Sequence, residues 1–272
     1  MTTAVETFAA QWQDWHQARE RALTTPHGWL TLTSFHWLPG TPTPLPGLPG
    51  RFWVSRGQAV FEGSAQDGVR VLSAEGEVGG PVLGETRAQV AEARSLEWLA
   101  VGDVVVELAL RGGRYAVRTR DPQAPALLQF AGVPTFDLDP GWIVEGTVEH
   151  FDAPRRIEVR TARADLVQYL TAVAAITLDI DGRAVSLLAT AGAGGTFTLA
   201  FADATSGDST APWRSVSTSV PDAEGRLRVD FNRAVNFPFA FSDYGTCPAP
   251  PAGNILPVAV TAGERAPLRV ES

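Results

Sequence analysis

The chain lacks or nearly lacks several residues on which particular chemistries depend. Lysine is absent, so all 22 positive charges are arginines, which excludes a Schiff base or a lysine general base. A single cysteine, Cys247, excludes an internal disulfide and fits a reducing compartment. The four histidines show none of the usual metal-ligand spacings. We therefore expect no metal and no cofactor.

Long apolar runs and an excess of positive charge are missing as well. The longest apolar run lies at residues 172–176, far short of the roughly 18 residues that a membrane helix needs. The opening Met-Thr-Thr-Ala-Val-Glu has neither the basic nor the apolar part of a signal peptide. The net charge of −8 argues against nucleic-acid binding. We expect a cytoplasmic protein that binds neither membranes nor nucleic acid.

The first residues carry a helical pattern. Phe8, Trp12, Trp15 and Ala22 recur at the spacing of one helix face, and Pro26 is expected to end the helix. The sequence therefore predicts one amphipathic helix at the N-terminal end, docked through its tryptophans.

Short strands separated by turns dominate the rest of the chain. A proline-rich connector at residues 39–50 can be neither helix nor central strand. Gly112-Gly113 and Asp181-Gly182 are hairpin signals between alternating runs. The expected strands lie near 51–55, 58–62, 69–73, 88–93, 103–109, 114–119, 142–149, 155–161, 166–170, 175–180, 183–190, 195–201, 213–219, 227–231 and 257–261. This pattern predicts a mainly β fold, either an antiparallel barrel or one or more sandwiches.

Three parts are expected along the chain. Residues 1–38 would form the helix and a docking segment, and residues 39–121 a smaller sandwich-like region. Residues 122–272 would form a barrel-like region, which either stands alone or shares one core with the region before it.

A polar segment near the end is the best candidate for function. Residues 230–257 read DFNRAVNFPFAFSDYGTCPAPPAGNILP and follow a strand-like run. Polar loops between ordered elements are where binding and catalytic residues concentrate. The candidate ligand-binding residues are Asp230, Asn232, Arg233, Asn236, Asp243, Tyr244, Cys247 and Asn254.

This segment resembles the signature of a bacterial family known as domain of unknown function 1684. Residues 28–38, 113–122 and 203–207 resemble further blocks of that family, so the resemblance spans nearly the whole chain. Phe239 stands where the family has its first cysteine, and Gly253-Asn254-Ile255 replaces its Glu-Asn-Arg. The resemblance implies a family and no biochemical activity.

Three functions remain open from the residues alone. The leading hypothesis is a module that binds a small anionic or amphipathic ligand, because Arg233 can receive a carboxylate or phosphate in a bidentate fork. The alternatives are a hydrolase that uses Asp230 or Asp243 as base, and a structural or partner-binding protein. In the structural interpretation Arg233 pairs with Asp230 or Asp243, and the asparagines cap turns. The sequence favours binding over catalysis and sets no oligomeric state.

Two further clusters of polar residues are expected to have structural rather than functional roles. Arg114, Arg118 and Arg120 share one face of a predicted strand, and we expect them to be solvated or paired with Asp121. The segment 203–208, rich in carboxylates and hydroxyls, is expected to form a turn rather than a cation site.

Overall fold

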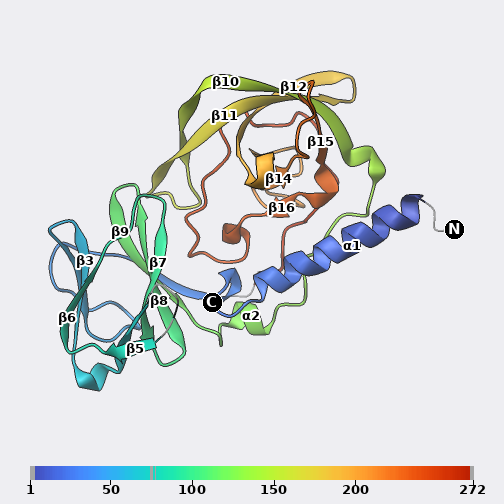
Figure 1. Cartoon of the computed structure of the whole chain (residues 1–272). Helices are drawn as coiled ribbons and strands as arrows, with labels where there is room; N and C mark the ends of the chain where they lie inside the picture. The colour runs from blue at the N-terminus through green and yellow to red at the C-terminus, as the bar shows by residue number, and fades with distance from the viewer. Residues whose placement is uncertain (1–3, 74–75, 77, 270–272) are drawn as a thin grey trace. The chain divides into compact units, whose positions relative to one another are not determined.

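The computed structural model describes residues 4–73, 76 and 78–269, and it shows a mainly β protein with one long N-terminal helix (Figure 1). Helix α1 (Ala4–Leu23) confirms the predicted amphipathic helix and ends before Pro26. Among the described residues, no helix has both the length and the apolar character needed to cross a membrane. The remaining helical pieces are short: α2 (Pro125–Leu128), η1 (Trp29–Thr31), η2 (Ala65–Asp67), η3 (Pro140–Trp142), η4 (Ala193–Gly195), η5 (Phe231–Arg233) and η6 (Pro238–Ala240).

The chain folds as two compact units. One unit joins residues 1–22 to residues 131–269, so α1 belongs with the C-terminal half of the sequence. The other contains residues 23–130. The division into 1–38, 39–121 and 122–272 stays a prediction beside this grouping.

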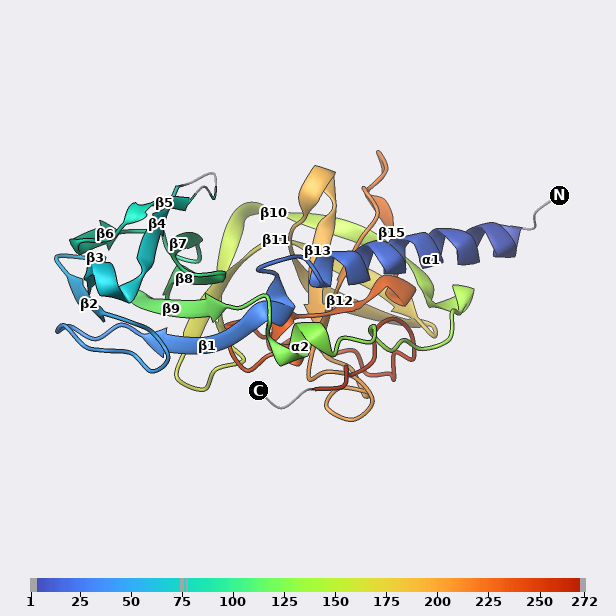
Figure 2. The same cartoon turned by 90° about the horizontal axis from the view of Figure 1, so that it is seen from below.

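The unit of residues 23–130 contains two antiparallel sheets. The larger has the strand order β1-β9-β8-β7-β4-β5, and the smaller has the order β2-β3-β6. Figure 2 shows β1 and β9 side by side. The bounds are β1 (Leu32–Trp37), β2 (Arg51–Ser55), β3 (Gln58–Gly63), β4 (Val69–Leu72), β5 (Val78–Pro81), β6 (Gly84–Ala88), β7 (Ser95–Val101), β8 (Val104–Arg111) and β9 (Arg114–Arg120).

One antiparallel sheet organises the unit of residues 131–269. Its strand order is β15-β10-β11-β12-β13-β14-β16, with β15 and β16 at its two edges. A single bridge, between Thr218 and Val229, links the end of β14 to β15, so the described strands form a sandwich-like fold rather than a closed barrel. The bounds are β10 (Ile143–Arg160), β11 (Val167–Ile180), β12 (Arg183–Ala191), β13 (Phe197–Phe201), β14 (Arg214–Ser217), β15 (Arg226–Asp230) and β16 (Val235–Asn236).

Each unit has its own apolar core. Large side chains that are almost completely buried make up most of it, and each contributes about 1.5–3 kcal/mol of hydrophobic stabilisation. In residues 131–269 the core includes Ile176, Leu178, Leu187, Leu199, Phe201 and Phe231. In residues 23–130 it includes Phe52, Phe61, Trp98, Leu99, Leu108 and Val117.

Two hairpins follow the glycine signals in the sequence. Asp181 and Gly182 join β11 to β12 with φ values of 54° and 73°, and Gly112 and Gly113 join β8 to β9 with φ values of 59° and 74°. Two successive residues with positive φ match the right-handed twist of the flanking strands, which is why glycine is favoured there.

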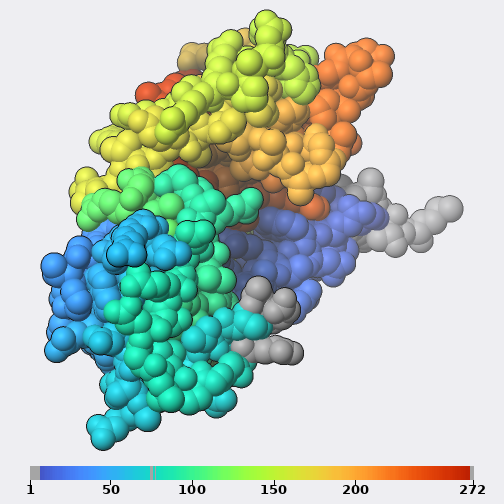
Figure 3. Space-filling model, turned by 60° about the vertical axis from the view of Figure 1, so that its left-hand side comes forward, coloured from blue at the N-terminus to red at the C-terminus, as the bar shows by residue number. Residues whose placement is uncertain are grey.

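The long strand β10 changes its register partway along. It pairs with β11 on both sides of a shift between His150 and Arg155, and Pro154 lies within this shift. Figure 3 shows the side chains of β10 and β11, in yellow-green and yellow, covering the upper surface of this view. Proline has no backbone N–H, so it fits an irregular stretch better than a regular ladder.

Candidate functional site

Asp230 ends β15 and begins the candidate segment with a cap. Its Oδ1 accepts from the backbone N–H of Asn232 at 3.1 Å and from Nδ2 of the same residue at 2.9 Å. This bonding turns the chain from β15 into η5. Asp230 therefore fixes the direction in which Arg233 leaves the turn.

Asn232 is buried, and both its side chain and its backbone carbonyl form hydrogen bonds with other segments. Its amide accepts from the N–H of Asp139 at 3.0 Å and donates to the carbonyl of Asp139 at 2.8 Å. Its own carbonyl accepts from the indole Nε1 of Trp12 at 2.8 Å. Asn232 thus joins α1 to the residue that precedes η3, and these contacts are structural.

Arg233 lies at the surface between α1 and the sheet. Its Nε is 3.3 Å from Oδ2 of Asp230, and its guanidinium carbon is 5.6 Å from the ring centroid of Trp15. The side chain is 36% exposed. The ion pair with Asp230 was one of the two expected from the sequence. Within the described residues, the terminal nitrogens of Arg233 make no hydrogen bond to protein.

Asn236 and Glu264 form a buried polar junction. Oε2 of Glu264 accepts from the backbone N–H of Asn236 at 2.6 Å, and Oε1 accepts from Nε of Arg19 at 2.9 Å. Nδ2 of Asn236 donates to the carbonyl of Arg265 at 2.8 Å. The Glu264 side chain is completely buried, so this junction fastens α1 to the segment around residues 264–265.

The side chain of Asn254 takes the place of backbone hydrogen bonds between β12 and β13. The pairing of Thr190 with Thr198 would bring Leu188 opposite Ala200. Instead, Nδ2 of Asn254 donates to both of these carbonyls at 2.8 Å, and its Oδ1 accepts from the N–H of Leu188 at 2.8 Å. Its backbone also pairs with β13 through Ala202. The segment around Asn254 therefore fills the sheet rather than capping a simple turn.

The last three candidates lie in the loop after η6. Asp243 is exposed and pairs with Nη1 of Arg269 at 2.9 Å. Tyr244 is half-buried, and its backbone N–H donates to Oγ of Ser242 at 3.2 Å. Cys247 is buried, and its carbonyl accepts from the N–H of Ala162 at 2.9 Å. A buried thiol is a packing residue unless a base reaches it.

A buried ion pair beneath this segment is not evident in the sequence. Nη2 of Arg214 donates to Oδ2 of Asp203 at 2.9 Å, and both side chains are fully buried. Oδ1 of Asp203 accepts from the N–H of Thr205 at 2.7 Å, which confirms the predicted turn. Burial lowers the pKa of Arg214, and the carboxylates of Asp203 and Glu264 oppose that effect. In the described residues, no group of three or more His, Cys, Asp and Glu could hold a metal ion.

Two hollows border the candidate segment. The first, which we call the helix groove, lies between α1 and the ends of β14 and β15 and has a volume of about 730 Å³. Phe8 and Trp15 provide its apolar wall. Its polar lining comprises Gln11, Arg19, Arg228, Asp230, Arg233, Ser215, Ser217, Thr218 and Ser219. Both Asp230 and Arg233 from the sequence prediction therefore lie in one groove.

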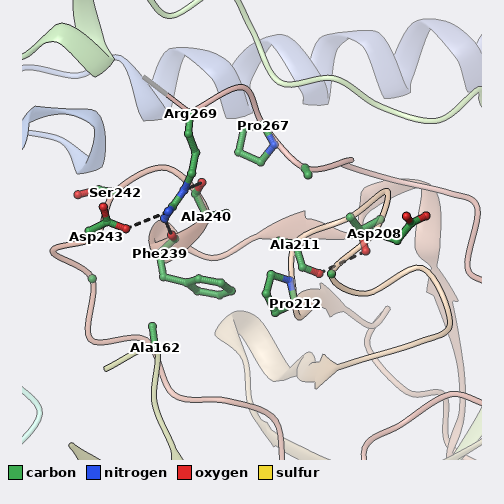
Figure 4. Close-up of a pocket in the computed structure, with 14 residues that line it drawn as sticks. Ala162, Asp208, Ala211, Pro212, Phe239, Ala240, Ser242, Asp243, Pro267 and Arg269 are labelled. Carbon is green, nitrogen blue, oxygen red and sulfur yellow. Dashed lines mark hydrogen bonds and ion pairs between the residues drawn. The ribbon is translucent and has the colours of Figure 1, made fainter. Parts of the chain in front are cut away.

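The second hollow, which we call the signature pocket, has a volume of about 430 Å³ (Figure 4). Its walls come from the loop after β13, from η6 and the loop that follows, and from the segment before Arg269. Of the eight candidate residues, only Asp243 lines it. Asn232, Asn236 and Asn254 are buried, and neither Tyr244 nor Cys247 lines the helix groove or the signature pocket.

The fold and these hollows define a mainly antiparallel β protein whose C-terminal signature segment is held by buried asparagines and ion pairs. Residues 128–265, about half of the chain, match the family described as protein of unknown function DUF1684. The chain belongs to this family.

Solved structures include a similar protein. The solution NMR structure of an uncharacterized protein from Haloarcula marismortui is 33% identical, with a TM-score of 0.43. The match covers 53% of this chain and 82% of that chain. A search of curated proteins finds no match. Neither the family nor this archaeal protein carries an assigned function.

Proposed function

We propose that this protein binds a small anionic ligand with an apolar portion, and that the ligand occupies the helix groove. The proposal rests on one observation: three arginines, Arg19, Arg228 and Arg233, line this groove, with Asp230 as the only carboxylate of its lining. A volume of about 730 Å³ lies within the usual range for small-molecule sites.

The charges of the groove are partly compensated. Glu264 neutralises Arg19 and Asp230 neutralises much of Arg233, both through contacts of the Nε edge. The Arg233 side chain is 36% exposed, and Arg228 is exposed as well. A carboxylate or phosphate can accept from guanidinium nitrogens in pairs, which gives both attraction and orientation.

The apolar wall of the groove would contact the apolar portion of the ligand. Trp15 and Phe8 come from one face of α1, and Trp15 already lies beneath the Arg233 guanidinium. The hydroxyls of Ser215 and Ser217 stand on one face of β14, because residues two apart in a strand share a face. Mixed apolar walls with a few convergent polar groups are typical of ligand sites.

The hydrolase alternative would use Asp230 or Asp243 as its base. Oδ1 of Asp230 accepts from the N–H and Nδ2 of Asn232, and Oδ2 of Asp230 pairs with Arg233. Asp243 pairs with Arg269. These contacts favour a structural or binding role for both carboxylates over the role of a base.

The first experiment is native mass spectrometry of the purified chain, which detects a co-purifying anion by its mass. Titration with octanoate and with octanol, followed by tryptophan fluorescence, then separates charge from apolar contact. We expect octanoate to bind more tightly, and we expect added salt to reduce the difference.

Variants locate the site. Arg233→Gln should remove most of the preference for octanoate, whereas Arg226→Gln, an exposed arginine outside the groove, should keep it. Equal binding of octanoate and octanol, or an unchanged preference in Arg233→Gln, would overturn the proposal.

We also propose a cytoplasmic location, supported by the single cysteine. Fractionation of cells that express the chain with an epitope tag tests this location, and recovery outside the cytoplasmic fraction would contradict it.

A further inference from the structure

We infer that the signature pocket is a second ligand site, and that it takes a small primary ammonium compound with a flat apolar body. This site is distinct from the helix groove: the two linings share no residue, and they carry opposite charge. The inference rests on the shape of the pocket, its walls and the balance of its charges.

The walls are apolar and firmly held. The Phe239 ring packs against Trp213 with a centroid distance of 4.1 Å, so the buried phenylalanine cannot swing away from the pocket without breaking that contact. Figure 4 shows Phe239, Ala211 and Pro212 on one side, with Pro267 on the other. Rings and prolines have few rotatable bonds, so they offer a preformed surface for a flat ligand at low entropic cost.

The guanidinium nitrogens of Arg269 are bonded to residues in the wall of the pocket. Nη2 donates to the carbonyl of Phe239 at 2.6 Å, Nε donates to the carbonyl of Ala240 at 3.2 Å, and Nη1 pairs with Asp243 at 2.9 Å. The guanidinium therefore fixes η6, and its positive charge is compensated by Asp243. This arrangement leaves it a poor partner for an anionic ligand.

Asp208 supplies the unbalanced charge. It lines the pocket from the loop after β13, and in Figure 4 it lies at the end opposite Asp243 and Arg269. Its backbone N–H donates to the carbonyl of Thr205 at 3.2 Å, which holds the loop. Asp208 is exposed, and across the described residues its carboxylate has no ion pair or hydrogen bond with protein. The lining therefore carries two carboxylates against one guanidinium.

The geometry assigns the two ends of the ligand. The ammonium group lies at Asp208, where three N–H donors meet an unpartnered carboxylate. The apolar body extends from there along Phe239 and Pro212. A volume of about 430 Å³ is near the lower end for ligand pockets, which suits a compound with one aromatic ring.

Three probes of nearly equal shape test the charge preference. Phenethylamine carries a positive charge at neutral pH, 2-phenylethanol is neutral, and 3-phenylpropionate is negative. Amide chemical shifts of the full chain report both affinity and location. We expect phenethylamine to bind about fivefold more tightly than the alcohol, the value of a partly exposed ion pair. Perturbed amides should cluster at residues 207–212 and 239–245.

Asp208→Asn is the decisive variant, because it keeps the size of the side chain and removes only its charge. It should abolish the preference for phenethylamine, while the exposed Asp152→Asn, far from the lining in sequence and outside it, should keep that preference. Equal affinity for amine and alcohol would overturn the inference. So would a preference that survives in Asp208→Asn, tighter binding of the propionate, or perturbed amides outside the pocket.

Discussion

Arg19 of helix α1 donates from Nε to Oε1 of Glu264 at 2.9 Å, across 245 positions of the sequence. The Glu264 carboxylate is completely buried, whereas Arg19 is 21% exposed. The pair therefore ties the first helix to the segment around Glu264, and Arg19 also lines the helix groove.

Replacing Arg19 should loosen this tie. Arg19→Met leaves a buried carboxylate with fewer donors, which costs about 3 kcal/mol of unfolding free energy. Arg226→Met removes only exposed pairs, with Asp222 and Glu224, and should cost less than about 1 kcal/mol. Urea denaturation of both variants measures the difference, and equal losses would contradict a role for Arg19 in holding α1.

The amide of Asn254 should matter as much as a core side chain. Asn254→Ala removes partners from the N–H and carbonyl of Leu188 and from the carbonyl of Ala200, and each buried group left unsatisfied costs about 1–3 kcal/mol. The neighbouring Ile255, 59% exposed, is the control. Ile255→Ala should change the free energy of unfolding by less than about 0.5 kcal/mol. Similar thermal midpoints for the two variants would refute this assignment.

Glu107 should make the stability of residues 23–130 sensitive to acid. Burial alone would raise the pKa of this carboxyl, but the guanidinium groups of Arg118 and Arg120 outweigh burial and hold the pKa below its usual value. The stabilisation is therefore complete above the unfolded pKa of about 4.3 and is lost as the pH falls through the lower folded value.

Glu107→Gln tests this pH dependence. Its deficit in unfolding free energy should be largest near pH 7 and should shrink as the pH falls through the lowered pKa of folded Glu107, where wild type loses the same charge. The exposed Glu97→Gln should change the free energy by less than about 0.5 kcal/mol at either pH. A deficit for Glu107→Gln that stays constant with pH would show that its charge contributes nothing.

The thiol of Cys247 should react slowly in the folded protein. The residue is 8% exposed, so a thiol reagent reaches it only when the segment opens. Reaction with a disulfide reagent, followed by absorbance, should be much slower in buffer than in denaturant. Comparable rates under the two conditions would mean that the segment around Cys247 opens readily.

Local sequence patterns predicted a helix or a hairpin well where residues close together in the sequence determine it. The helix face of Trp12 and Trp15 docks as expected, and the hairpins at Gly112-Gly113 and Asp181-Gly182 form. The expected strands at 142–149 and 155–161 merge into β10, because a register shift interrupts the pattern without ending the strand. The strands β1, β5 and β7 and the two-residue β16 were missed, and the expected strand at 88–93 coincides with β6 only at Ala88.

The predicted strand at residues 257–261 does not form. The carbonyl of Val260 accepts from Nη2 of Arg214 at 3.0 Å, and Arg214 also donates to the carbonyl of Ala262 at 2.6 Å. These backbone carbonyls accept from a buried arginine and not from the N–H groups of a neighbouring strand. Such a partner is evident only in the tertiary fold.

Charged residues were the hardest to place from sequence. Arg118 and Arg120 were expected to be solvated or paired with Asp121, but they are buried and pair with Glu107. The pair of Arg233 with Asp230 was foreseen because the two are three residues apart. Arg19 and Glu264 offered no local signal, since their contact depends on how α1 docks.

The interruption in β10 bears on how copies of this protein avoid one another. The edge strand β15 pairs with β10 only from Ile143 to Thr147, so Arg155 and Arg156 pair with β11 on one side alone, and both are exposed. An open strand edge with regular N–H and C=O groups invites a second chain to extend the sheet. Pro154 removes a donor from that edge, and the arginines beside it add like charges that would meet across such a contact. By these rules, the stretch of β10 around Pro154 is a poor template for a second chain.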